Sequence, residues 1–99
     1  MGLGRDEIFA ALQGRDEELR QLGVRSLSLF GSAVRSEATA ESDLDFLVEL
    51  ASVSFDAYMD VKEHLERLFR RRVDLVLADA IKPRLRSRIL AEAVRVPGL

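Results

Sequence analysis

The sequence contains no cysteine, no tryptophan and only one histidine, His64. The lack of cysteine excludes disulfides, thiolate metal sites and a cysteine nucleophile. No second histidine lies four residues from His64, which excludes the two-histidine helix of a zinc protease and predicts a solvated helix residue. No uninterrupted apolar run approaches the roughly 20 residues that span a bilayer, and the first ten residues lack the apolar stretch of a signal peptide. These absences predict a cytoplasmic protein.

The chain has 99 residues and a net charge of −2. Because domains commonly have about 100–200 residues, we expect one domain over residues 1–99. Residues 1–54 carry five basic and ten acidic side chains, whereas residues 55–99 carry ten basic and seven acidic ones. A nucleic-acid-binding domain would be basic overall, so we do not expect direct binding to nucleic acid. Thirteen of the fifteen basic residues are arginine, which suits phosphate recognition but more often reflects surface ion pairing or genome composition.

Apolar residues recur at helical and strand spacings along the chain. We expect helices at 5–22, 54–70 and 83–93, and strands at 24–30, 43–50, 72–77 and, in short form, 94–96. Gly14 weakens the middle of the first helix and Gly23 ends it. A short helical turn near 33–36 follows the first strand. This order predicts an α/β (α+β) fold in which helices pack on a small mixed β-sheet.

Two carboxylates lie at alternate positions of the second predicted strand, in Asp43-x-Asp45. Strand periodicity places both on one face of the sheet, about 7 Å apart along the strand at a rise of roughly 3.4 Å per residue. Asp74 lies on the next predicted strand with the same alternation and is able to reach the same face. Such a cluster suits Mg²⁺, which prefers oxygen ligands, and it would repel itself without a cation. Taken alone, the pair also fits the solvent-facing side of a half-exposed strand.

The turn after the first strand has the character of an anion site. At Gly31-Ser32, backbone N–H groups point outward, glycine permits close approach of a phosphate, and the serine hydroxyl adds a donor. A Gly-Ser pair is by itself typical of ordinary turns. Next to Asp43-x-Asp45, it predicts a phosphate cradle that faces a pair of metal-binding carboxylates.

Residues 30–49 resemble the signature of the minimal nucleotidyltransferases of the DNA polymerase β superfamily. Gly31-Ser32, the ten residues 33–42, and Asp43-x-Asp45 follow that pattern without a gap, and Arg-Val-Asp-Leu-Val at 72–76 is also similar. Ser36 departs from it, because many relatives have glycine after the arginine. The resemblance extends over essentially the whole chain and implies the polymerase β palm-like fold.

The resemblance also implies a reaction. A hydroxyl group attacks the α-phosphate of ATP, AMP is transferred, and pyrophosphate leaves. Asp43 and Asp45 would bind two Mg²⁺ ions, and Asp74 would hold the ion that activates the hydroxyl and help to accept its proton. Together these three residues are the expected catalytic and metal-binding groups.

Gly31 and Ser32 would hold the β- and γ-phosphates of ATP, again as the resemblance implies. Arg35 has two interpretations: a further phosphate contact, or a surface ion pair with Glu37 or Glu41.

The resemblance further implies a protein partner. Similar proteins are antitoxins that transfer AMP to a tyrosine of a helical HEPN-domain toxin. The alternative is a non-catalytic binding module that neutralises its partner by contact. Arg84 and Arg88, four residues apart on the last predicted helix, form a basic strip that suits docking of such a partner.

Overall fold

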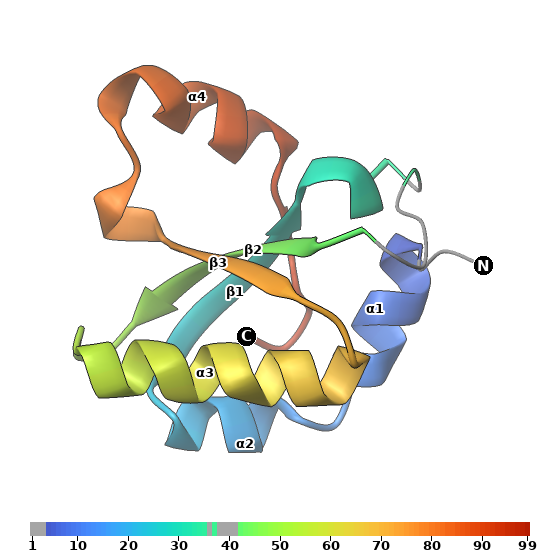
Figure 1. Cartoon of the computed structure of the whole chain (residues 1–99), viewed down its shortest axis with the longest axis vertical. Coiled ribbons are helices and arrows are strands. Elements are labelled where there is room, and N and C mark those ends of the chain that lie inside the picture. Colours follow the sequence, from blue (N-terminus) through green and yellow to red (C-terminus); the bar gives the residue numbers. More distant parts are fainter. Residues whose placement is uncertain (1–3, 36, 38–41) are drawn as a thin grey trace.

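The fold is organised around a four-stranded mixed sheet (Figure 1). The structure is a computed structural model that describes residues 4–35, 37 and 42–99. The strands are β1 (Val24–Phe30), β2 (Leu44–Leu50), β3 (Val73–Leu77) and β4 (Val94–Arg95), in the spatial order β3-β2-β1-β4. β1 pairs antiparallel with β2 and β4, whereas β2 pairs parallel with β3. The predicted small mixed sheet is confirmed, with each strand within one residue of its expected bounds.

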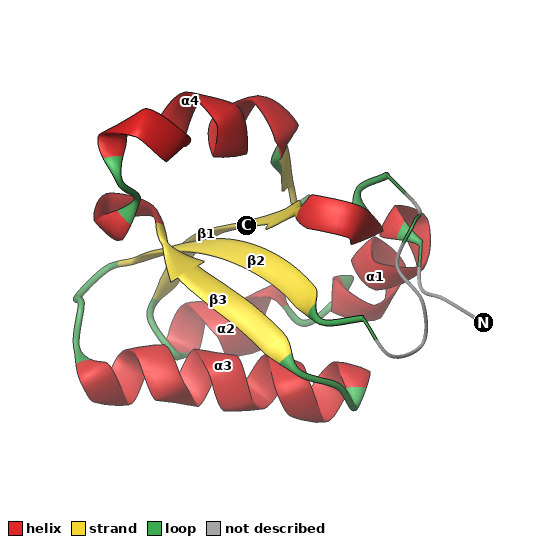
Figure 2. Cartoon of the chain, turned by 45° about the horizontal axis from the view of Figure 1, so that its top comes forward, coloured by secondary structure: helices red, strands yellow, loops and turns green. Residues whose placement is uncertain are grey.

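Helices lie on both faces of this sheet. They are α1 (Arg5–Leu12), α2 (Asp16–Gln21), α3 (Phe55–Phe69) and α4 (Pro83–Glu92), with short 3₁₀ helices η1 (Gly31–Ala33) and η2 (Ala78–Ala80). The first three helices cover one face, and α4 crosses the other (Figure 2). The helical turn expected near 33–36 begins earlier, at Gly31. None of the described helices has the length and apolar character needed to cross a bilayer.

The single helix expected over 5–22 is wrong, because the chain breaks between α1 and α2. Gln13 adopts an extended conformation with ψ 129°, and Gly14 has a φ of +84°. Only glycine enters that left-handed region without strain. The break turns α2 so that Leu19 is buried in the core together with Ile8 of α1.

The core lies between the sheet and helices α1–α3. As the alternation predicts, the even-numbered residues of β2 are all buried, and Leu47 is buried as well, on the face towards α4. Phe46 stacks on Phe69 of α3 with 5.9 Å between ring centroids. Ser54 caps α3 by accepting a hydrogen bond from the Ala57 N–H at 3.1 Å. Tyr58 packs against this core and donates its hydroxyl to the Leu75 carbonyl of β3 at 2.7 Å. These contacts fix α3 under β2 and β3.

His64 is more enclosed than its predicted solvated position. Its side chain is 23% exposed, and its Nε2 lies 3.3 Å from Glu18 Oε2 of α2. The reason is that α2 folds back beside α3 after the break at Gly14. His64 thus joins α3 to α2.

Phe46→Ala tests the core with a matched control on the surface. Removal of a fully buried ring costs about 3–5 kcal/mol, whereas Phe55, at the start of α3, is 76% exposed. We expect Phe46→Ala to lower the free energy of unfolding by that amount in urea titrations, and Phe55→Ala to change it by less than about 0.5 kcal/mol. Equal effects of the two variants would contradict this placement of the core.

Candidate active site

The parallel pairing of β2 with β3 brings two of the three expected carboxylates together. In this register Asp45 is the direct partner of Asp74, and on its other side Asp45 lies opposite Phe30, the last residue of β1. Asp45 therefore lies between the end of β1 and the edge strand β3. Its side chain is half-buried, while Asp43 and Asp74 are exposed.

Gly31 lies directly against the Asp45 carboxylate. A Cβ built on Gly31 would lie 2.2 Å from Asp45 Oδ2, and the residue has a φ of +80°. Both facts demand glycine, because any side chain would collide with Asp45 and strain the backbone. The turn then closes on itself: the Ser32 carbonyl accepts the N–H groups of Arg35 at 3.1 Å and Glu37 at 2.9 Å.

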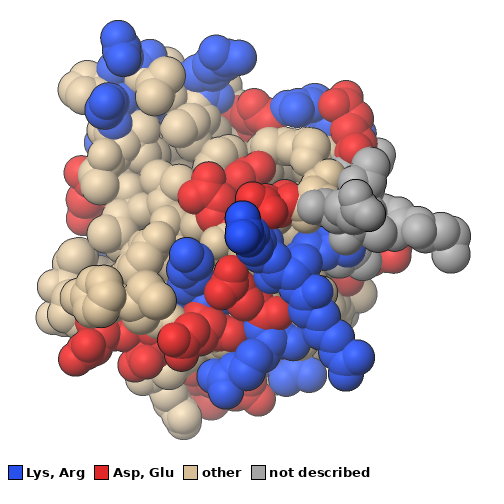
Figure 3. All heavy atoms as spheres, viewed as in Figure 1, with Lys and Arg blue, Asp and Glu red and all other residues tan. Residues whose placement is uncertain are grey.

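The carboxylates interact electrostatically. The pKa of Asp45 is raised from its usual 3.8 to about 6, first by burial and then by the negative charges of Asp74 and Asp43. A hydrogen bond with Asp74 and the charge of Glu92 act in the same direction. Acidic side chains gather in the middle of this face below α4 (Figure 3). A bound cation would relieve this repulsion.

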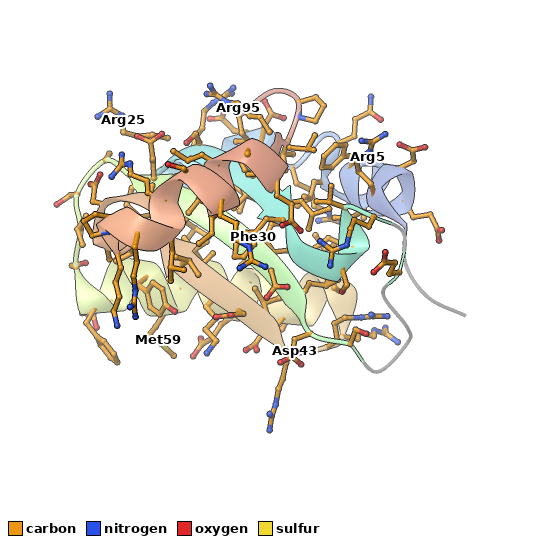
Figure 4. All side chains as sticks on the ribbon, turned by 90° about the horizontal axis from the view of Figure 1, so that it is seen from above. Arg5, Arg25, Phe30, Asp43, Met59 and Arg95 are labelled. Carbon is orange, nitrogen blue, oxygen red and sulfur yellow. The ribbon has the colours of Figure 1, made fainter. Side chains whose placement is uncertain are left out.

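Of the three carboxylates, Asp43 lies outside the strand pairing that joins Asp45 and Asp74. It precedes β2 and lies at the rim of the molecule (Figure 4), in a shallow hollow that it shares with Lys62, Arg72 and Asp74. Across residues 4–35, 37 and 42–99, no three histidine, aspartate or glutamate side chains are arranged to hold a metal ion as they stand. Cation binding would therefore have to draw these carboxylates closer together.

Arg35 forms an ion pair with Glu37, one of the two roles that the sequence suggests for it. Its guanidinium lies 3.3 Å from Glu37 and also pairs with Glu92, the last residue of α4. Glu41, the other expected partner, lies outside the described residues, as does Ser36.

Glu92 is the residue of this site that the sequence analysis missed. Its Oε1 accepts the Gly31 N–H at 3.1 Å in addition to the Arg35 guanidinium. The sequence holds one faint signal: an acid in the last turn of a helix, where the helix dipole favours cations. Nothing in the spacing connects it with a turn 61 residues away.

Comparison with known proteins gives three concordant matches. The family described as nucleotidyltransferase domain matches residues 15–96. Protein adenylyltransferase MntA of Thermococcus cleftensis is 39% identical over 93 residues, which are 92% of this chain and 94% of that protein. A solved structure of a candidate minimal nucleotidyltransferase is 34% identical with a TM-score of 0.72, over 87% of this chain and 93% of that one.

A more distant match shows the same fold. It is a structure of a tri-AMPylated Shewanella oneidensis HEPN toxin in complex with an MNT antitoxin, 19% identical with a TM-score of 0.58. The match covers 88% of this chain and 72% of that one.

Gly31→Ala tests the contact with Asp45, and Gly23→Ala is its control. Gly23 also has a positive φ, +98°, but a Cβ there would meet nothing within 4 Å. The control should lose only the cost of a left-handed alanine, roughly 1–2 kcal/mol. We expect Gly31→Ala to lose more, since the new methyl group must also push Asp45 aside. Thermal or urea unfolding of both variants measures the difference, and equal losses would contradict the close approach.

Asp45→Asn tests the raised pKa of Asp45. The folded protein binds this proton more tightly than the unfolded chain, so ionisation of Asp45 lowers the free energy of unfolding as the pH rises from about 4 to about 6. At pH 7 without metal, the variant should be more stable than the parent protein by on the order of 1 kcal/mol after solvent screening. The gap should close near pH 4. Asp60→Asn on the exposed side of α3 is the control, and a gap that does not vary with pH would refute the assignment.

Proposed function

The chain belongs to the nucleotidyltransferase domain family, and we propose that it is a protein adenylyltransferase that transfers AMP from ATP to a hydroxyl group of a partner protein and releases pyrophosphate. The observation that carries the proposal is the pairing of Asp45 with Asp74 directly beside the Gly31-Ser32 turn. The relative from Thermococcus cleftensis, matched over 92% of this chain, supports AMP as the transferred group.

Asp43, Asp45 and Asp74 are the residues that would hold two Mg²⁺ ions. The donor chemistry fits, since carboxylate oxygens are ligands that Mg²⁺ prefers. The raised pKa of Asp45 also fits, because it reports a half-buried place where negative charges crowd together. When bound, two such ions stabilise the attacking and leaving oxygens of an in-line displacement.

Each of the chain's own groups has a role in this proposal. Asp74 lies on the exposed edge strand β3, where an incoming hydroxyl has access, and it accepts the proton of that hydroxyl. Gly31, Ser32 and Arg35 supply N–H, hydroxyl and guanidinium donors for the terminal phosphates. Such donors hold the leaving pyrophosphate in line with the attack, and positioning of this kind supplies much of the catalysis in phosphoryl-type transfer.

The acceptor is a tyrosine of a HEPN-domain toxin in this proposal. The match to an MNT antitoxin in complex with an AMPylated HEPN toxin supports this class of partner. The described residues form one four-stranded sheet with helices on its faces, and in this proposal the partner brings the acceptor hydroxyl to the site. A partner that presents its own hydroxyl supplies the missing positioning, which contributes roughly 7–11 kcal/mol in well-oriented reactions.

Co-expression with the product of the adjacent gene tests the proposal, with a HEPN-domain protein as the expected partner. We expect the intact mass of the partner to rise by whole AMP units in the presence of Mg²⁺ and ATP. Asp45→Asn should abolish the rise while the protein stays folded, because asparagine keeps the size of the side chain but removes the charge that attracts the cation. Asp60→Asn, the same change on an exposed helix face, should leave it intact.

Full transfer by Asp45→Asn would refute the assigned site. If the parent protein and Asp45→Asn both form a tight complex and the partner gains no mass in either case, the chain is instead an antitoxin that acts by contact alone.

A further inference from the structure

One oxygen of Glu92 occupies the two donors that the proposed function assigns to phosphate. Glu92 Oε1 accepts the Gly31 N–H at 3.1 Å and pairs with the Arg35 guanidinium. A backbone N–H and a guanidinium around one anionic oxygen form the same charge-assisted arrangement that binds a phosphate oxygen. The Glu92 side chain is 30% exposed, so solvent and a soluble ligand reach this place.

Glu92 is carried by the most weakly held helix of the fold. No residue of α4 is buried, and Leu85 and Leu90 on it are 40% and 49% exposed. The helix stands over the sheet face opposite the main core (Figures 1 and 2). A cavity of about 210 Å³ remains between the two, lined in part by Ser28, Leu47 and Leu90. Outward movement of α4 would therefore break few apolar contacts, although its C-terminal end leads into β4, where Val94 pairs with Leu29 of β1.

The position of Glu92 is electrostatically unfavourable except for those two donors. The carboxylate lies in the last residue of a helix, where the helix dipole repels negative charge. It also lies close enough to Asp45 to help raise the pKa of that residue. The Gly31 N–H and the Arg35 guanidinium compensate for both effects. A ligand that binds these two donors therefore also removes the contacts that stabilise the Glu92 carboxylate at this position.

We propose that Glu92 is an internal competitor for the phosphate position, which its carboxylate fills until the terminal phosphates of a nucleotide displace it and loosen the last turn of α4. The inference rests on the proposed function, because it takes the Gly31-Ser32 turn as the phosphate cradle. Linkage adds a consequence: a partner that draws α4 away from the turn raises the affinity for nucleotide, and nucleotide raises the affinity for that partner equally.

Calorimetric binding to the full chain tests the displacement, with Mg²⁺-ATP and tripolyphosphate as probes. Glu92→Gln keeps the size and one carbonyl oxygen of the side chain but loses the charge. We expect it to lower the Kd for both probes by about threefold to tenfold. Glu37→Gln is the matched control, since Glu37 also pairs with Arg35 but does not contact the Gly31 N–H; it should change the Kd by less than twofold. Binding of adenosine, which lacks phosphate, should be equal in all three proteins.

Weaker binding by Glu92→Gln would show that Glu92 positions the donors, and it would overturn the proposal. An unchanged Kd would overturn it as well. If the parent protein and the variant both fail to bind Mg²⁺-ATP, the proposed transfer of AMP fails together with the inference. If ATP binds equally to both, only the inference fails.

Amide hydrogen exchange of the unmutated protein gives a second test that needs no variant. We expect Mg²⁺-ATP to speed exchange in the last turn of α4, at Leu90 to Ala93, because that turn loses the contact of Glu92 with Gly31 and Arg35. Slower exchange there on addition of nucleotide would overturn the displacement of Glu92. Thermal unfolding of Glu92→Gln confirms that the variant used for calorimetry is folded.

Discussion

The parallel register that places Asp45 beside Asp74 is the constraint on which the rest of this structure depends. Two carboxylates at the same level of adjacent strands repel each other, and the half-buried one is also poorly hydrated. The pairing persists because the opposite face of the same strands is apolar and fully covered. Leu44, Phe46 and Val48 are all 0% exposed on that face. Apolar packing on one face of β2 and β3 thus keeps Asp45 and Asp74 adjacent on the other face, although their charges repel each other.

The features around this pair follow from it. Because Asp45 lies opposite the end of β1, the chain that leaves β1 must pass directly over its carboxylate, and only a residue without a side chain fits there. The same close passage exposes the Gly31 N–H to an anion. In this structure that anion is Glu92, which approaches from α4. The Gly31-Ser32 turn therefore lies between two carboxylates, those of Asp45 and Glu92. The Gly31 N–H and the Arg35 guanidinium are the donors that stabilise Glu92.

Much of this could be predicted from the sequence, because it depends on local spacing. Strand alternation correctly placed Phe46 in the core and Asp45 on the other face, and the resemblance carried by Gly31-Ser32 and Asp43-x-Asp45 is confirmed by the family match. The break at Gly14 was missed because apolar residues on both sides of it continue one helical stripe. The backbone conformations of Gln13 and Gly14 separate the two helices.

Glu92 was missed for a different reason, since its contact depends on where α4 lies rather than on any local pattern. The apolar residues of α4, such as Leu85 and Ile89, are not buried, so packing does not fix the direction of the helix across the sheet and sequence spacing does not locate its last turn. The weak packing of α4 also allows this helix to respond to a ligand at the Gly31-Ser32 turn. A helix fixed by apolar packing would hold its carboxylate whatever bound at the turn. Because a charge-assisted contact of Glu92 holds the last turn of α4 to the Gly31-Ser32 turn, a ligand that binds those donors better loosens the helix ahead of its pairing in β4. Binding at the site thereby changes the surface that α4 presents to a partner.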